Sequence, residues 1–196
     1  MARLAKFSPA QIVAATARLA ARDGPAQATM ARIAGELGAP TGSIYHRFAS
    51  RDLLLGEVWL GAAESFQQAF GAALEGPEPW AAGLAAALLV PARVREQPDE
   101  ARILILHRRD DFLAGGWPPA IAARAAALKQ RADGGLRNYC RRLPGRADLP
   151  LAAVAPHLRA GEPLPAGLDA LIHAACAAVF VAAGASPPKS STRRKS

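Results

Sequence analysis

Residues 29–48, TMARIAGELGAPTGSIYHRF, contain two short helical segments separated by a tight turn. In the first segment the apolar positions recur at i, i+3, i+4 and i+7, which indicates one buried helical face at Met30, Ile33, Ala34 and Leu37. Thr29 can cap this helix, and Gly38 lies where the helix must end with a positive φ. Pro40 and Thr41 open the second segment, and Ile44 anchors it to the core. This layout predicts a helix-turn-helix whose second helix enters the major groove of DNA.

The outward side of the second segment is polar and rich in hydrogen-bond donors. It carries the side chains of Thr41, Ser43, Tyr45, His46 and Arg47, and Gly42 leaves the backbone open to close approach. The alternative interpretation is an ordinary helical hairpin packed within a core. The polar face, the shortness of the second helix and its place after one amphipathic helix favour the DNA-binding interpretation.

The composition predicts an all-α protein. Hydrophobic residues make up 51% of the 196 residues, and Ala dominates them, whereas the alternation of β-branched and aromatic residues typical of strands is nearly absent. Residues 1–60 carry seven Lys and Arg against four Asp and Glu, and residues 186–196 carry four against none. Excess positive charge at the helix-turn-helix end is what contact with DNA phosphates requires.

Several classes of site have no support in the sequence. Cys140 and Cys176 stand far apart without a CxxC pair or nearby His residues, so we expect reduced thiols and neither a disulfide framework nor a metal site. Residues 170–188 are apolar but too rich in Ala and Gly to predict a membrane span, and no secretory signal is recognisable. We therefore expect a cytoplasmic protein without cofactors.

The remaining pattern is helical, with breaks that suggest two domains. Ser8-Pro9-Ala10-Gln11 is a capping box that starts a first helix, and Ser50 caps a long fourth helix that extends to about residue 73. We expect further helices over 80–96, with Pro91 as a kink or break, and over 98–112, 120–142 and 167–183. A short helical stretch is expected within 151–158, and residues 186–196 are expected to form a disordered basic tail.

Residues 8–59 resemble the N-terminal domain of TetR-type transcriptional regulators. The matching positions are Ile33-Ala34, Leu37-Gly38, Gly42-Ser43-Ile44-Tyr45, Phe48, Ser50, Arg51-Asp52 and Leu54. The resemblance implies a three-helix DNA-binding domain over residues 1–50. It also implies a helical ligand-binding and dimerisation domain over 51–185, with the fourth helix as connector.

The resemblance also implies roles for single residues. Thr41, Gly42 and Ser43 match the start of the recognition helix, where members approach base edges. Tyr45 and Arg51 match phosphate contacts, and Thr29 matches a cap beside the DNA backbone. His46 falls at a variable position. Arg47 stands where many members carry His, and it could meet phosphate or read guanine.

The resulting hypothesis is a bacterial homodimeric repressor that a small, largely apolar effector releases from a palindromic operator in double-stranded DNA. Helices 120–142 and 167–183 are expected to form the dimer surface through Ala-rich, charge-poor faces. The candidate effector contacts are the aromatic or polar-tipped residues Trp80, His107, Phe112, Trp117 and Tyr139.

Two alternatives remain open. The chain could be a DNA-binding protein without an effector, such as a constitutive repressor or a nucleoid-type binder. An enzyme is disfavoured because the four His are scattered and no catalytic motif or paired-carboxylate spacing occurs, so no catalytic residues are assigned. The tail either adds non-specific DNA affinity or is an inert solubilising end.

Overall fold

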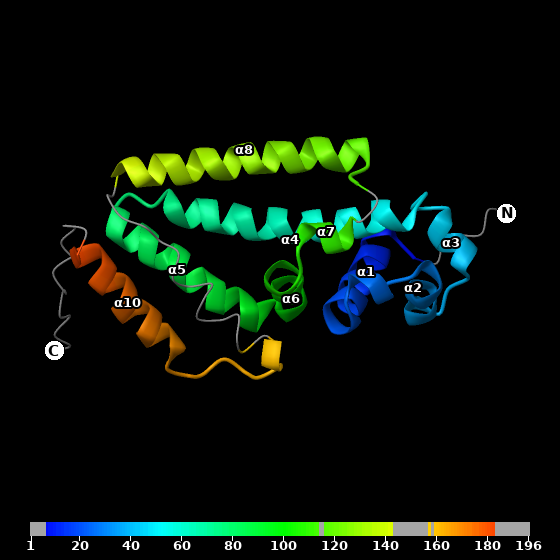
Figure 1. Ribbon diagram of the computed structural model, residues 1–196, viewed down its shortest axis with the longest axis horizontal. Helices are drawn as coiled ribbons and strands as arrows, with labels where there is room; N and C mark the ends of the chain where they lie inside the picture. The colour runs from blue at the N-terminus through cyan, green and yellow to red at the C-terminus, as the bar shows by residue number, and fades with distance from the viewer. Residues whose placement is uncertain (1–6, 114–115, 143–156, 158, 183–196) are drawn as a thin grey trace, which may run out of the picture.

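The computed structural model describes residues 7–113, 116–142, 157 and 159–182, and within these ranges every regular element is helical. Helices α1 to α3 form one end of the molecule, and the long helix α4 runs from that end to the opposite one (Figure 1). The prediction of an all-α fold is confirmed for these residues. The expected stretch within 151–158, apart from His157, and the basic tail lie outside them.

Helices α1 and α2 begin and end where the sequence predicts, and α3 begins where it predicts. Helix α1 (Pro9–Asp23) starts with the expected capping box, in which Ser8 and Gln11 exchange side-chain and backbone hydrogen bonds. A 3₁₀ turn, η1 (Pro25–Gln27), connects it to α2 (Met30–Leu37), and α3 (Thr41–Tyr45) follows. The α1 side chains that face these helices are buried, so α1 packs against the α2–α3 pair.

Two long helices form the middle of the molecule. Helix α4 (Arg51–Leu74), capped by Ser50, spans about 36 Å at 1.5 Å per residue. Helix α5 (Pro79–Glu96) packs against it and continues through Pro91, which is buried inside the helix. Of the kink or break expected at Pro91, the break is therefore wrong. Packing of the surrounding apolar residues against α4 and α10 offsets the one backbone hydrogen bond that proline removes.

The single helix expected over 98–112 is divided into α6 (Pro98–Leu106) and α7 (Arg109–Phe112). His107 between them is extended, with φ −122° and ψ 149°. The Asp111 carboxylate accepts a hydrogen bond from the backbone N–H of Arg108 at 2.7 Å, which starts a new helix instead of continuing the old one. This break turns α7 back toward α4 and η1.

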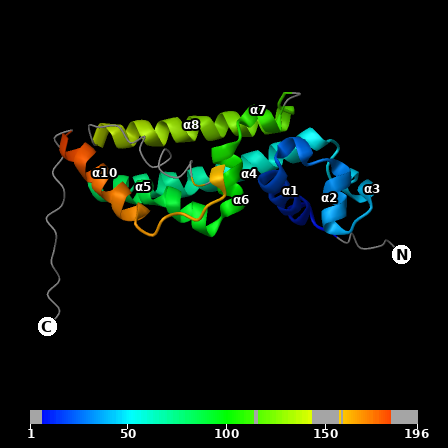
Figure 2. The same ribbon diagram turned by 60° about the horizontal axis from the view of Figure 1, so that its bottom comes forward.

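Helices α8 (Pro119–Arg142) and α10 (Leu168–Ala182) cover the middle pair. Helix α8 packs along α4 and α10 packs along α5, so α4 and α5 lie between them (Figures 1 and 2). Gly56 permits the close approach of α8, because a Cβ at this position would lie 3.2 Å from Ile121 Cγ2. The two outer helices therefore present separate exposed faces.

The N-terminal helices do not have a core of their own. Their buried residues form one cluster with Ile103 of α6 and with Phe112 and Leu113 at the end of α7. A second cluster joins α5 to α10, and a third joins α4 to α8. The domain division at residue 50 stays a prediction, and this shared core shows that the N-terminal end is packed directly on α6 and α7.

Candidate nucleic-acid interface and interior cavity

The α2–α3 pair has the geometry of a helix-turn-helix. Gly38 ends α2 in the left-handed conformation, with φ 59° and ψ 37°, as the sequence predicts. Its N–H and that of Ala39 bond back to the carbonyls of Gly35 and Ala34. Ala34 is 2% exposed and Ile44 is fully buried, which fixes α3 across α2. The turn therefore holds α3 beside α2 at the end of the molecule (Figure 1).

The polar side chains predicted for DNA contact gather at this end, with one difference in their local structure. Helix α3 has only five residues, so His46 and Arg47 lie in the turn that follows it rather than on the helix itself. Both are exposed, as are Ser43 and Tyr45, and the Tyr45 side chain is the most exposed aromatic of the domain at 52%. Thr29, also exposed, caps α2 by accepting a hydrogen bond from the Arg32 N–H.

Gly42, in the first turn of α3, is not required by the fold. A Cβ added there would meet nothing within 4 Å, and its φ is not in the positive range. Glycine in a helix costs about 1 kcal/mol relative to alanine. An exposed glycine that the chain itself does not need fits a surface where another molecule approaches the backbone.

Arg51 differs from the other predicted contacts because its guanidinium is turned inward. It donates to three carbonyl oxygens of the α1–α2 connection, at 2.6 Å to Pro25, 3.0 Å to Ala28 and 3.3 Å to Ala26. Its side chain is 34% exposed. In this conformation Arg51 fastens the start of α4 to η1 instead of presenting its charge to phosphate.

Part of the positive charge at this end is neutralised within the domain. Arg22 pairs with Asp23 and Glu36, and Arg32 pairs with Asp23 as well. Arg22 and Arg32 lower the pKa of Asp23, with the hydrogen bond from Arg22 as the largest cause. Asp23 therefore stays ionised at neutral pH, and the charge available to DNA from this network is smaller than the count of Arg residues suggests.

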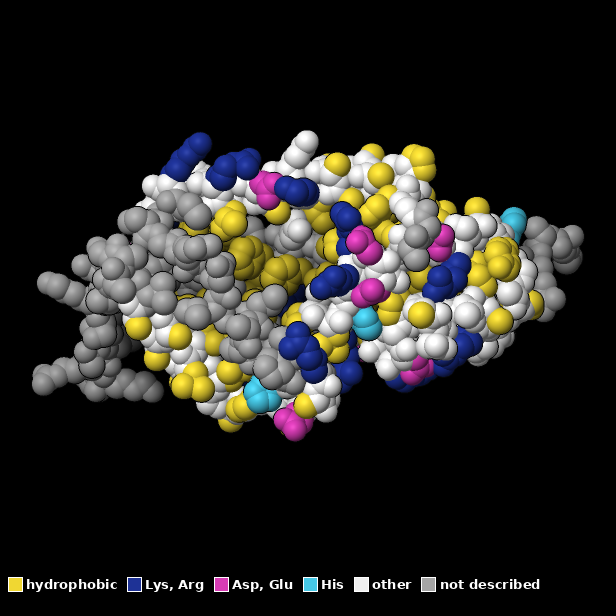
Figure 3. Space-filling view, viewed as in Figure 1, with side chains coloured by type: hydrophobic (Ala, Val, Ile, Leu, Met, Phe, Trp, Pro, Cys, Tyr) yellow, Lys and Arg dark blue, Asp and Glu magenta, His cyan; other side chains and the backbone are white. Residues whose placement is uncertain are grey.

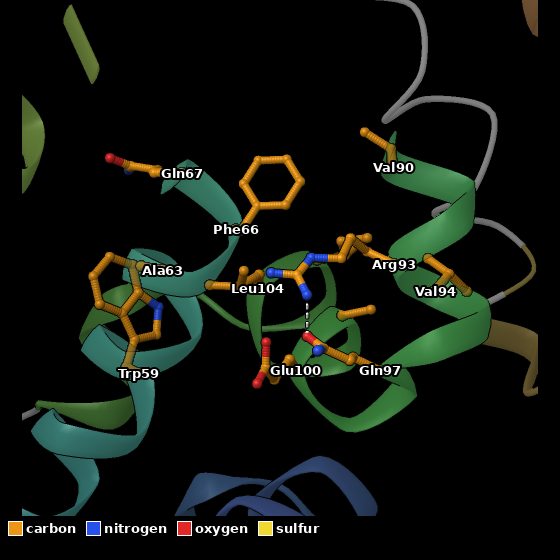
Figure 4. Close-up of a pocket in the computed structure, with 12 residues that line it drawn as sticks. Trp59, Ala63, Phe66, Gln67, Val90, Arg93, Val94, Gln97, Glu100 and Leu104 are labelled. Carbon is orange, nitrogen blue, oxygen red and sulfur yellow. Dashed lines mark hydrogen bonds between the residues drawn. The ribbon is translucent and has the colours of Figure 1, made fainter. Parts of the chain in front are cut away.

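A partly open cavity of about 200 Å³ lies between α4, α5 and α6. Apolar side chains provide most of its walls. Trp59, Ala63 and Phe66 project from α4, while α5 and α6 face them with further aliphatic groups (Figure 4). Two of the three helices that line the cavity, α4 and α6, also pack on α1. An occupant would therefore touch helices that support the DNA-binding end.

A few polar groups interrupt this apolar lining. Arg93 extends from α5 into the space between the helices, where it donates to Gln97 and, at 2.6 Å, to Ser65 of α4 (Figure 4). Glu100 lies in the first turn of α6 and also lines the cavity. Gln67 Oε1 is buried with no hydrogen-bond partner among the residues that the structure describes.

The five aromatic or polar-tipped residues predicted as effector contacts do not line this cavity. Trp80 and Tyr139 are buried where α5 meets α8 and α10, and the Tyr139 hydroxyl donates to the Pro79 carbonyl at 3.1 Å. His107 packs edge-on against Phe112 beside the N-terminal core. Trp117 contacts Trp59 with ring centroids 5.7 Å apart, so it supports the wall from outside.

The residues that do line the cavity carried little signal in the sequence. Trp59 and Phe66 fit an ordinary apolar helix, and Arg93 and Glu100 fit solvated charges at helix ends. Only the packing of three helices separated in sequence brings them together. Aromatic character alone did not distinguish wall residues from residues of the closed core.

Other classes of site find no support within the described ranges. No helix there is long and apolar enough to cross a membrane. No group of three or more His, Cys, Asp or Glu side chains there could hold a metal ion. Cys176 is a free, buried thiol whose pKa is raised by burial, while the side chain of Cys140 is not described.

Comparison with known proteins agrees with this geometry. Residues 12–58, which contain the helix-turn-helix and the start of α4, match the sequence family described as bacterial regulatory proteins, tetR family. No curated protein sequence matches the chain significantly.

Solved structures match over most of the chain. A transcriptional regulator from Rhodococcus sp. Rha1 is 20% identical, with a TM-score of 0.70 over 92% of this chain and 100% of that one. The TetR family transcriptional regulator PfmR from Thermus thermophilus is 20% identical, with a TM-score of 0.66 over 89% and 96%. A tetR family regulator from Shewanella sp. PV-4 is 17% identical, with a TM-score of 0.63 over 90% and 98%. At these identities the likeness establishes the fold.

Proposed function

Because the chain belongs to the tetR family of bacterial regulatory proteins, we propose that it is a homodimeric repressor that releases a palindromic operator when a small effector binds. The observation that carries the proposal is the exposed α3 with its adjoining turn, where Gly42, Ser43, Tyr45 and Arg47 stand clear of the rest of the molecule. An α-helix presented in this way fits the major groove.

We assign the side chains at this end to two tasks. Thr41, Gly42 and Ser43 would approach base edges, and Tyr45 and Thr29 would meet the DNA backbone. The exposed His46 and Arg47 would also contact DNA, Arg47 through either phosphate or guanine. For Arg51, whose match to a phosphate contact stays a prediction, we propose an additional role as a positioning residue that holds α4 to η1.

A dimer is needed because a single five-residue helix reads only one half-site. The outer face of α8 is an unfavourable centre for a two-fold contact, because it exposes four basic residues, Lys129, Arg131, Arg137 and Arg141. The other two basic residues of α8 are bonded to neighbouring elements, Arg124 to Glu57 and Glu64 and Arg142 to the carbonyls of Leu74 and Gly76. Figure 3 shows Lys and Arg side chains at the upper edge of the molecule, where α8 runs. Helix α10 has one acidic residue, Asp169, and exposes 66% of Leu171, so its outer face is the better partner surface.

The effector would act through the helices that surround the cavity. A ligand that separates α4 from α6 would move the N-terminal end, because α6 packs on α1 and Arg51 ties α4 to η1. A coupling of about 1–3 kcal/mol between the two sites would weaken operator binding several-fold to a hundredfold.

Selection of bound sequences from a random DNA pool at physiological salt tests the DNA-binding function. We expect a palindromic consensus whose half-sites are separated by about one helical turn. Enrichment of no sequence, with weak binding that disappears as salt rises, would instead indicate a nucleoid-type binder. A specific consensus on a protein that no small molecule affects would indicate a constitutive repressor.

A further inference from the structure

The cavity between α4, α5 and α6 contains two opposite charges that are not paired with each other. Arg93 reaches into it from α5 and Glu100 from α6, and Figure 4 shows both head groups directed into the same space. Neither takes part in any of the ion pairs found among the described residues. Both side chains are partly buried, and each charge lies at the end of its helix that favours it, so both can stay charged and available to a ligand.

The hydrogen bonds of Arg93 leave room for an occupant. Its two bonded acceptors, Gln97 Oε1 and Ser65 Oγ, are neutral, and they use two of its five N–H groups. These two bonds hold the guanidinium in a fixed orientation and leave its other N–H groups able to donate to a ligand. A carboxylate is the group that such a planar fork binds best.

The carboxylate of Glu100 makes a purely anionic ligand unfavourable in this cavity. This carboxylate would repel an anionic head bound at Arg93, and the guanidinium would repel a cationic head bound at Glu100. A head that carries both charges satisfies both residues at once. The walls around it are apolar and aromatic, with Trp59 and Phe66 on one side and Val90 and Val94 on the other.

Resting on the proposed role of this cavity as the effector site, we infer that the effector is a zwitterion with an apolar body, the chemistry of a free hydrophobic α-amino acid. Its carboxylate lies on Arg93, its ammonium on Glu100, and its side chain between Trp59, Phe66 and Val94. The volume of about 200 Å³ suits this size, since a cavity of about 150 Å³ holds a benzene molecule.

A matched series of ligands tests the inference by calorimetry on the full-length protein without DNA. L-phenylalanine carries both charges, 3-phenylpropionate only the carboxylate, 2-phenylethylamine only the ammonium and 3-phenyl-1-propanol neither. We expect L-phenylalanine to bind about ten- to a hundredfold more tightly than each of the other three, because each lost charge removes charge-assisted hydrogen bonds. Equal or tighter binding of any other member, or no binding by all four, overturns the inference.

Two variants assign each charge to its residue. Arg93→Gln should reduce the affinity for L-phenylalanine at least tenfold and leave the affinity for 2-phenylethylamine unchanged or higher. Glu100→Gln should reduce the affinity for L-phenylalanine about tenfold and raise the affinity for 3-phenylpropionate about tenfold. Arg93→Lys, which keeps the charge but not the fork, should retain part of the affinity. Retained binding of 2-phenylethylamine by Arg93→Gln shows that the loss of L-phenylalanine affinity in that variant is not misfolding. Unchanged L-phenylalanine affinity in both Gln variants contradicts the assignment.

Operator binding is measured separately. If L-phenylalanine binds as described and operator affinity stays constant, the ligand class stands and the proposed release of DNA fails. If no operator exists, calorimetry still decides the ligand class.

Discussion

The Nη2 atom of Arg51, at the start of α4, lies 2.6 Å from the carbonyl oxygen of Pro25, at the start of η1. This bond and those to Ala28 and Ala26 satisfy carbonyls in and beside a short 3₁₀ turn. They also join the helix that lines the cavity to the segment that leads into the helix-turn-helix. The hydrogen bonds of Arg51 therefore connect α4, which lines the cavity, to the segment just before the helix-turn-helix.

Arg51→Ala separates a positioning role from a phosphate contact. We expect the free energy of unfolding to fall by about 1–3 kcal/mol, because three hydrogen bonds to backbone carbonyls are lost, two of them partly buried. Operator affinity should fall as well, while the slope of log affinity against log salt stays constant. These quantities are measured by denaturant unfolding and by operator titration over a salt series.

Arg47→Ala is the matched control, since Arg47 is exposed and lies in the turn after α3. Its stability should remain within about 0.5 kcal/mol of the parent. A phosphate contact at either Arg would reduce the salt slope by about one unit on substitution. If Arg51→Ala reduces the slope and leaves stability unchanged, Arg51 is a phosphate contact and the conformation seen here changes on DNA.

Gly42→Ala should stabilise the protein and weaken operator binding. The added methyl group meets nothing within 4 Å and the backbone φ suits alanine, so we expect a gain of about 0.5–1 kcal/mol in thermal or denaturant unfolding. The same methyl group would occupy the space that DNA requires. Gly61→Ala on α4 is the control, because it is equally unhindered and exposed but remote from α3. A loss of operator affinity in both variants would argue against a contact at Gly42.

Tyr45→Phe removes only a hydroxyl from an exposed ring. Because the hydroxyl is proposed to donate to phosphate, affinity should fall about two- to tenfold by the same factor on operator and on mutated operator sequences. Stability should not change. A loss confined to the operator would assign Tyr45 to base reading, and no loss on any sequence would remove it from the interface.

The sequence predicted local features well because their causes are local. The Ser8 and Thr29 caps and the left-handed Gly38 each depend on a few neighbouring residues, and all three are found. The break at His107 was missed because the competing hydrogen bond from Arg108 to Asp111 looks, in sequence, like a continuation of helical polar residues. Continuity through Pro91 depends on α4 and α10, which helical periodicity does not contain.

The candidate sites show the same difference between features with local causes and features that depend on distant parts of the chain. Exposed residues of α3 could be predicted, since exposure there follows from the short turn and the buried Ile44. The inward orientation of Arg51 depends on carbonyls more than twenty residues away. The cavity depends on three helices at once, so its two opposite charges, Arg93 on α5 and Glu100 on α6, had no signature at either position.

Leu171→Arg tests where the subunits meet. The side chain is 66% exposed in the single chain, so replacing it should change monomer stability by less than about 0.5 kcal/mol. At a two-fold contact centred on α10 it would place like charges against each other, and we expect light scattering to show a monomer at micromolar concentration. Leu136→Arg on α8, where 46% of the side chain is exposed, should leave the dimer intact. Dissociation by Leu136→Arg alone would move the interface to α8, despite the positive charge of that helix, and a parent chain that is itself monomeric would refute the dimeric repressor.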